Sequence, residues 1–178
     1  MATAELMAQA DAALTNEVIA HLEAQLVAAR RLLGVVLEQG VAIRNRDVKG
    51  VVALTGVLQA ELYHRQQLEN ERIVLLERAG ARLGVPGVSV TVALLETLMD
   101  PESALAAGAR SAELRGLLEV IQREHHVNRA LMGQELAFLD HLMKLAGIAG
   151  DESYNAGGDR LATTAAQTTG HRVFDLEC

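Results

Sequence analysis

The sequence predicts an all-α fold: a long antiparallel helical hairpin followed by a third long helix, forming a three-helix bundle or coiled coil, with a short helical insert. Strong helix formers, above all Ala, Leu, Glu, Gln and Arg, dominate the chain. Its 178 residues include only two prolines, Pro86 and Pro101. Apolar residues also alternate at four- and three-residue spacing through three long segments, which is the pattern of helices packed side by side. A chain of this length can bury one core.

The hairpin follows from one heptad seam, one cap and one stop signal. The seam predicts the first helix over about residues 15–44. Asp47 suits an N-cap, because its carboxylate can accept free amides of the next helix, which is predicted over residues 48–83. Gly84 and the nearby Pro86 end that helix. The connection between the two helices is so short that they must run antiparallel.

The rest of the helical region is predicted to contain two short pieces and one long helix. Residues 89–99 are expected to form a short helix despite their β-branched start. Asp100 and Pro101 are an N-cap and a first helical residue, and they open another short piece that ends before Gly108. The third long helix is expected from about residue 111 to residue 146, with an apolar face wide enough to contact more than one neighbour.

The composition divides the chain into residues 1–148, a helical bundle domain, and residues 149–178, a mostly flexible C-terminal tail. The tail is rich in Ala, Thr, Gly and Gln, and part of it is low in complexity. Tyr154 lies in it, although the chain has only two tyrosines and two phenylalanines. A tyrosine outside the packed segments is best explained by contact with a partner; the alternative is that it folds back on the bundle.

Charge and motif searches exclude several classes of function. A net charge of -7 disfavours nucleic-acid binding. The first residues do not resemble a secretory signal, and no run of about 18 apolar residues could span a membrane, so a cytoplasmic protein is expected. The only cysteine, Cys178, cannot form an intrachain disulfide or a thiolate metal cluster.

Catalytic and metal-binding patterns are also missing from the sequence. A di-iron bundle needs two Glu-x-x-His motifs, and only Glu61 and His64 have that spacing. His125 and His126 are adjacent, so on a helix they point about 100° apart and cannot share one metal. No nucleophile turn or phosphate loop is present. We expect no metal, no cofactor and no enzymatic activity.

Four polar residues interrupt the apolar seams at heptad centres: Arg65, Arg72, Asn128 and Glu135. One hypothesis is an interhelical polar layer that pairs one or both arginines with Glu135 and Asn128 and so sets the helix register. The alternative is local pairing within one helix, Glu61 with Arg65 and Glu69 with Arg72, which contributes about 0.3 to 0.5 kcal/mol per exposed pair.

In their order along the chain, these features resemble the FlgN family of flagellar export chaperones over roughly residues 15–158. The resemblance is carried by the first heptad helix, the Asp47 turn, the stretch 68–76 (Leu-Glu-Asn-Glu-Arg-Ile-Val-Leu-Leu), the pattern 128–132 (Asn-Arg-Ala-Leu-Met) and the ending Ser153-Tyr154 followed by Gly157 and Gly158. That ending is similar to the family's Tyr-x-x-x-Gly motif. The chain departs from the family in having more Ala and Val and fewer charges.

The resemblance implies an ATP-independent chaperone that binds the C-terminal segments of the hook-filament junction proteins FlgK and FlgL. It would deliver them to the export gate protein FlhA, with Tyr154, Gly157 and Gly158 as the docking motif. A client helix could lie along an apolar groove of the third helix. The candidate contacts are Leu131, Met132, Leu136, Phe138, Leu139, Leu142, Met143 and Leu145.

The sequence alone does not divide these residues between the core and a client surface. Two other classes of function remain open. One is a structural coiled-coil protein that associates with itself through its seams. The other is a ferritin-like bundle that binds metal.

Overall fold

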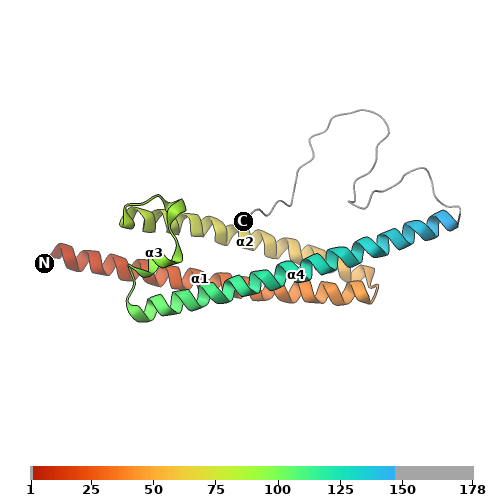
Figure 1. The fold of residues 1–178 in the computed structure, drawn as a ribbon, viewed down its shortest axis with the longest axis horizontal. Helices are drawn as coiled ribbons and strands as arrows, with labels where there is room; N and C mark the ends of the chain where they lie inside the picture. The colour runs from red at the N-terminus through yellow and green to blue at the C-terminus, as the bar shows by residue number, and fades with distance from the viewer. Residues whose placement is uncertain (1, 147–178) are drawn as a thin grey trace, which may run out of the picture. The chain divides into compact units, whose positions relative to one another are not determined.

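The computed structural model describes residues 2–146, and in that range the chain is all α-helical apart from its connections (Figure 1). The elements are α1 (Ala2–Arg44), α2 (Val48–Leu83), the 3-10 helix η1 (Gly87–Ser89), α3 (Val92–Glu96) and α4 (Pro101–Leu145). These described residues contain no strand. The predicted fold class is confirmed: a long helical hairpin, a short helical insert and a third long helix.

The hairpin turn forms where the sequence predicts it. The side chain of Asp47 caps α2, because its Oδ1 accepts the backbone N–H of Gly50 at 3.0 Å. At the other end of the hairpin, however, α1 begins at Ala2 rather than near residue 15. The added turns contain helix formers without Gly or Pro. The predicted helix was too short because the prediction used the apolar seam, which starts later in the sequence.

A glycine in the left-handed conformation ends α2. Gly84 has φ 71°, and its N–H and that of Val85 both bind the carbonyl of Gly80. The chain then folds back onto the last turns of α2. A Cβ added to Gly80 would lie 2.6 Å from the Val85 oxygen and 2.9 Å from the nitrogen of Gly87. The return of the connection therefore requires a residue without a side chain at position 80.

The insert is shorter than predicted, and the helix after it is longer. Residues 89–99 include the end of η1, two extended residues and the five-residue α3. The helix α3 begins only at Val92, because the Thr91 side chain caps it by accepting the N–H of Leu94 at 3.3 Å. Asp100 caps α4, and its Oδ1 accepts the N–H groups of Glu102 and Ser103 at 3.1 and 3.0 Å.

The predicted break at Gly108 is wrong, because α4 is continuous from Pro101 to Leu145. Gly108 is helical, and a Cβ at this position would lie 3.0 Å from Oε1 of Glu96. The glycine therefore permits a close approach of the residue that ends α3. It lies inside α4 and lacks the positive φ that Gly84 has at the end of α2.

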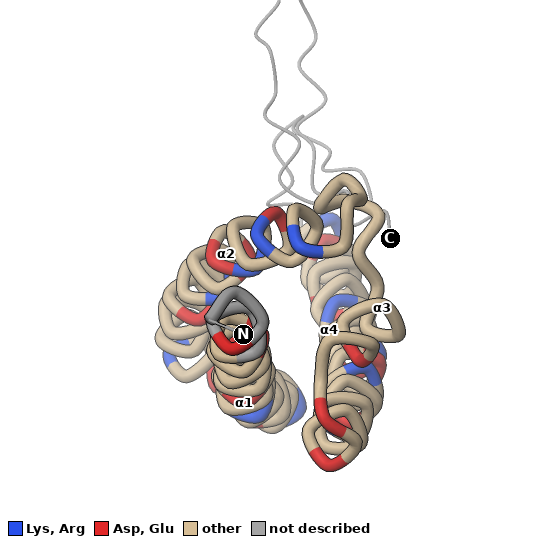
Figure 2. Tube along the Cα trace, turned by 90° about the vertical axis from the view of Figure 1, so that its left-hand side faces the viewer, with Lys and Arg blue, Asp and Glu red and all other residues tan. Residues whose placement is uncertain are grey.

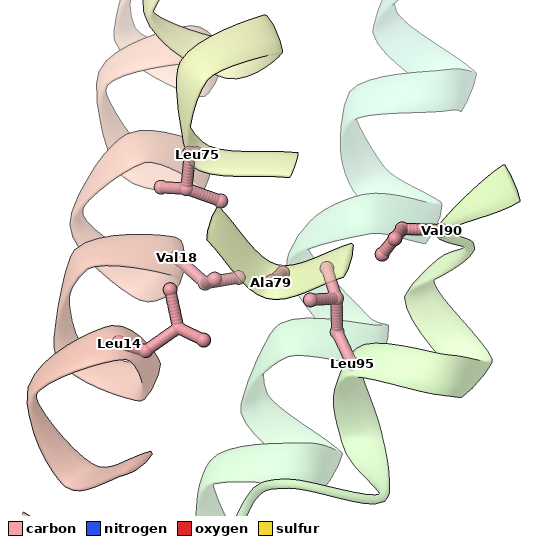
Figure 3. Close-up of a cluster of buried hydrophobic side chains, with 6 residues drawn as sticks. All are labelled: Leu14, Val18, Leu75, Ala79, Val90 and Leu95. Carbon is pink, nitrogen blue, oxygen red and sulfur yellow. The ribbon is translucent and has the colours of Figure 1, made fainter. Parts of the chain in front are cut away.

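Two clusters of buried apolar side chains hold the helices together. The first, called here the α3 cluster, joins α1, α2 and the insert, and its side chains converge in Figure 3: Leu14, Val18, Leu75, Ala79, Val90 and Leu95. The second, called here the α4 cluster, joins α1 to α4 and consists of Ala29, Leu32, Val36 and Ile121. Apolar residues at helical spacing on α1 thus serve two different neighbours in turn.

By its internal contacts the chain divides into two units, residues 1–132 and residues 133–178. The first unit holds both clusters, and α4 begins within it. Of the second unit, the structure describes residues 133–146, which are helical as far as Leu145.

Candidate functional site

The second unit presents an exposed apolar helix face. Six of the eight predicted client-contact residues are between 42% and 72% exposed: Leu136, Phe138, Leu139, Leu142, Met143 and Leu145. The other two, Leu131 and Met132, are partly buried and belong to the first unit. We call the six exposed residues the α4 face. Contiguous exposed apolar surface of this kind is typical of sites that contact another protein.

The spacing of these side chains places them together. Successive helical residues are about 100° apart, so residues 136, 138, 139, 142, 143 and 145 cover about half of the helix circumference. Glu135 interrupts this half, and the other half carries Gln134, Asp140, His141 and Lys144 beside two small residues. It carries an ion pair between Lys144 Nζ and Asp140 Oδ2 at 2.6 Å, one turn apart. The segment therefore has the amphipathic pattern of a helix that lies against a partner.

Asn128 is the most buried polar side chain in the described part of the chain, at 2% exposed. Its Nδ2 donates a hydrogen bond of 2.7 Å to the backbone carbonyl of Val36, which joins α4 to α1. Gly40 makes this approach possible, since a Cβ there would lie 2.6 Å from Asn128 Oδ1. A buried amide with one partner on the facing helix specifies the register of the two helices, because any shift leaves the amide unpaired.

The two seam arginines of α2 lie elsewhere. Arg72 donates from Nε to Glu69 Oε2 at 2.9 Å, and this hydrogen bond lowers the pKa of Glu69. Arg65 is exposed, and in the described residues its guanidinium makes no hydrogen bond or ion pair. Glu61 does not pair with it; Glu61 Oε2 lies 3.7 Å from Arg31 Nε on α1. The local pairing considered for Glu69 and Arg72 is present, and that for Glu61 and Arg65 is not.

Asn128 binds a backbone carbonyl on α1, so the structure does not bring it to either arginine. Glu135, the fourth residue of the proposed polar layer, belongs to the second unit. The two polar seam residues of α4 thus belong to different units, and Asn128 contacts α1 within the first unit.

Sequence reasoning missed a cavity of about 300 Å³ within the first unit, which we call the α1 groove. Figure 2 looks along the helices of this unit and shows α2 on one side of α1 and the first turns of α4 on the other. The lining of the groove includes Leu22 and Leu32 of α1, Arg65 and Leu68 of α2, and Leu114 and Leu118 of α4. Val92 of α3 also lines it. The two arginines in the α2 seam were the signal for the groove, because an arginine is rarely buried without a partner and two closely packed helices would bury a heptad centre.

Exposed ion pairs link α1 to both neighbouring helices. Arg78 on α2 pairs with Glu17, and the hydrogen bond from this guanidinium lowers the pKa of the Glu17 carboxyl. Arg30 on α1 pairs with Glu113 on α4 at 2.6 Å. Pairs this exposed add little to stability, but they are consistent with a single alignment of the helices.

A histidine lies in the interface of α1 and α2. Burial lowers the pKa of His21, and the nearby Glu71 carboxylate opposes that effect in part. The His21 Nε2 and the Gln25 amide are 3.0 Å apart and form a hydrogen bond within α1. The neutral imidazole is therefore the form that this interface favours.

The family model described as FlgN protein matches residues 7–160, which is most of the chain. The chain belongs to the FlgN family. The match includes the α1 groove, the α4 face and the tyrosine motif. No curated protein and no solved structure matches the chain. Membership of the FlgN family assigns the chain, in general terms, to the flagellar export chaperones.

The structure of this FlgN family chain describes only some of the features that the sequence predicts. Tyr154, Gly157 and Gly158 lie outside the described residues. Among the described residues, no group of three or more His, Cys, Asp or Glu side chains is placed to hold a metal ion. No described helix has the length and hydropathy needed to cross a membrane.

Proposed function

We propose that this FlgN family protein is a cytoplasmic export chaperone for hook-filament junction proteins of the FlgK and FlgL type. It covers the C-terminal amphipathic helices of these clients and delivers them to the export gate protein FlhA. The observation that carries the proposal is the α4 face, six exposed apolar residues on one half of a helix that lies within the family match.

The α4 face suits an amphipathic client helix for three physical reasons. Its residues repeat at helical spacing, so a second helix can pack its own apolar ridge along them. Met143 is unbranched and can adapt to clients of different sequence. The face is exposed in the free protein, so binding removes apolar surface from water on both partners. Covering the apolar face of the client's helix prevents the client from associating with other copies of itself before export.

Leu139→Glu is expected to lower the affinity for a junction-protein C-terminal peptide about 10- to 100-fold, since burying a leucine contributes about 1.5–3 kcal/mol. Isothermal titration calorimetry measures the affinity, with peptides from FlgK and FlgL of the same bacterium. Ala137→Glu, which adds the same charge to an exposed residue outside the apolar half of the helix, is the matched control and should bind as the wild type does. Equal affinities for all three proteins would place client binding elsewhere, and a wild type that binds neither peptide would refute the proposed function.

We assign docking at the export gate to Tyr154, with Gly157 and Gly158 allowing the backbone to approach the gate closely. The tyrosine ring combines a large contact area with a polar tip. Tyr154→Ala should abolish binding of the chaperone–client complex to the cytoplasmic domain of FlhA and leave client affinity unchanged. Tyr154→Phe should retain most of the binding. If Tyr154→Ala instead lowers the melting temperature and keeps FlhA binding, the tyrosine folds back on the bundle and the docking role is wrong.

A self-associating structural protein is the rival reading, and size measurement separates the two. The chaperone reading expects that adding the client peptide yields a defined complex of chaperone and peptide by analytical ultracentrifugation. A stable homo-oligomer that ignores the peptide would favour the rival.

A further inference from the structure

The outer side of α2 carries exposed apolar residues along its first half. We call this surface the α2 face, and it consists of Val48, Val52, Ala53, Gly56, Val57, Ala60 and Tyr63, all of which are exposed. The three residues Val48, Val52 and Tyr63 are between 68% and 72% exposed. Successive helical residues are about 100° apart, so the seven positions fall within one half of the helix circumference. Exposed apolar surface of this kind marks a site of contact with another protein.

The charged residues of the same stretch lie on the opposite side of α2. Residues 50–70 include only three Asp, Glu, Lys or Arg residues, which are Glu61, Arg65 and Glu69. All three line the α1 groove and so lie on the side of α2 that faces α1 and α4. A surface helix normally turns its charges toward water and its apolar residues toward the core. In this stretch the charges lie inward and the outer side has none, which indicates that a partner covers the outer side.

An opposite charge lies at each end of the α2 face, on the same side of the helix. Lys49 precedes the uncharged surface; it is exposed and makes no hydrogen bond or ion pair within the described residues. Glu71 follows the uncharged surface, and its side chain is 66% exposed, with a long contact of 3.9 Å to the ring of His21. Two antiparallel copies of α2 would bring Lys49 of each copy to Glu71 of the other. The charges therefore complement a second, antiparallel copy of the same helix.

The spacing of these residues specifies one register for such a pair. When Lys49 faces the partner's Glu71, Ala60 lies on the two-fold axis, because it is midway between them in the sequence. The small side chain of Ala60 allows the two helices to approach closely at the axis. In the same register, the ring of Tyr63 lies opposite the partner's Val57, so that two exposed apolar side chains cover each other. Apolar contacts and ion pairs thus agree on one arrangement.

A shallow groove between α1 and α2 extends this surface beyond Glu71. The small side chains of Ala20 and Ala24 on α1 line the groove together with Val74 on α2. In the antiparallel register, the hairpin turn of the partner reaches this level. The partner's Val48, which is 72% exposed in the free chain, can then leave water by entering the groove.

We propose that the α2 face is the interface of a homodimer, in which two copies pack α2 against α2, antiparallel, about a two-fold axis at Ala60. Ion pairs between Lys49 and Glu71 close both ends of the interface. The interface uses no residue of the α4 face, so dimerisation and client binding are independent. The inference goes beyond the proposed function and does not rest on it.

An engineered disulfide tests the register in the full chain, with Cys178→Ser removing the native thiol. Helices packed about 8–10 Å apart bring the Cα atoms on a two-fold axis to within about 5.4 Å, which a disulfide can bridge. Ala60→Cys should therefore form a covalent dimer on oxidation, seen on a non-reducing gel. Val52→Cys lies on the same face two turns from the axis, so its two copies would be about 24 Å apart and should not bridge. Bridging of both variants would indicate parallel helices, and bridging of neither would remove the interface; each result would overturn the proposal.

Sedimentation velocity over a concentration series tests the energetics. Ala60→Glu should raise the dimer dissociation constant about tenfold or more, because two carboxylates would meet at the axis. Ala112→Glu places the same charge on an exposed alanine of α4 and should dimerise as the wild type does. Lys49→Glu should also weaken the dimer, and adding Glu71→Lys should restore it. A wild type that stays monomeric throughout the series, or a double variant without restoration, would contradict the proposal.

Titration with the junction-protein peptide separates this inference from the proposed function. The wild-type dimer and the Ala60→Glu monomer should bind the peptide with equal affinity. If the wild type is monomeric and Ala60→Glu weakens peptide binding, the α2 face belongs to the client and the dimer proposal is wrong. If the dimer forms and no peptide binds, the proposed function fails while the dimer interface stands.

Discussion

Gly80→Ala is expected to destabilise the first unit by about 3 kcal/mol, although an alanine in the middle of a helix is normally favourable by about 1 kcal/mol over glycine. The cause is the backbone that folds over α2. The new Cβ would lie 2.6 Å from the Val85 oxygen and 2.9 Å from the Gly87 nitrogen. Both are backbone atoms, so no side-chain rotation relieves the contact. The connection must move, and it carries Val90 of the α3 cluster with it.

Urea denaturation followed by circular dichroism measures this effect, with Gly56→Ala as the matched control on the same helix. A Cβ at Gly56 meets no atom within 4 Å, so this variant should be stabilised by up to about 1 kcal/mol. Opposite signs for the two variants are therefore expected. A stabilised Gly80→Ala would mean that the connection does not pack on α2 as described.

The second large effect concerns the buried amide between α4 and α1. Asn128→Ala removes the 2.7 Å hydrogen bond to the Val36 carbonyl and leaves a small cavity, so a loss of about 2 kcal/mol is expected. Gly40→Ala should cost a similar amount by a different route. Its methyl group would lie 2.6 Å from Asn128 Oδ1 and would push the amide out of reach of Val36.

Because both single changes disrupt the same contact, their effects should not add. In the double variant no amide remains to collide with the alanine at position 40, and the helix gains a better helix former. The double variant should therefore be more stable than the sum of the two losses predicts, by about 1–3 kcal/mol. Free energies of unfolding for the four proteins of the cycle give this coupling directly. Simple additivity would show that Asn128 and Gly40 do not interact in solution.

Local signals in the sequence predicted the helix ends of the hairpin well. Asp47 caps α2 and Gly84 ends it, because capping depends on a side chain or a backbone conformation within a few residues. The start of α1 was missed, since its first turns lie before the apolar seam. Gly108 was misread for a related reason: a helical glycine that makes room for Glu96 cannot be distinguished in sequence from a glycine that ends a helix.

The candidate site was predicted in part. Heptad spacing identified the apolar residues of α4, but their exposure depends on which helices cover them, and six of the eight are exposed. The arginines in the α2 seam indicated that the apolar packing is interrupted there, but the sequence did not show which groups they contact. Arg72 forms a hydrogen bond with Glu69 on its own helix. Arg65 lines a cavity that exists only because of the spacing between three helices.

By itself the sequence determined the helical class, the caps at Asp47 and Gly84, the apolar face of α4 and the FlgN resemblance, since each of these depends on residue type and short-range spacing. The tertiary structure decided that Asn128 reaches Val36 across Gly40, and that side chains of α1, α2, α3 and α4 leave a cavity of about 300 Å³ between them. The physical reason is that periodicity specifies which side of a helix is apolar. Only the placement of the neighbouring helices specifies whether that side is filled by the chain itself or left for a partner.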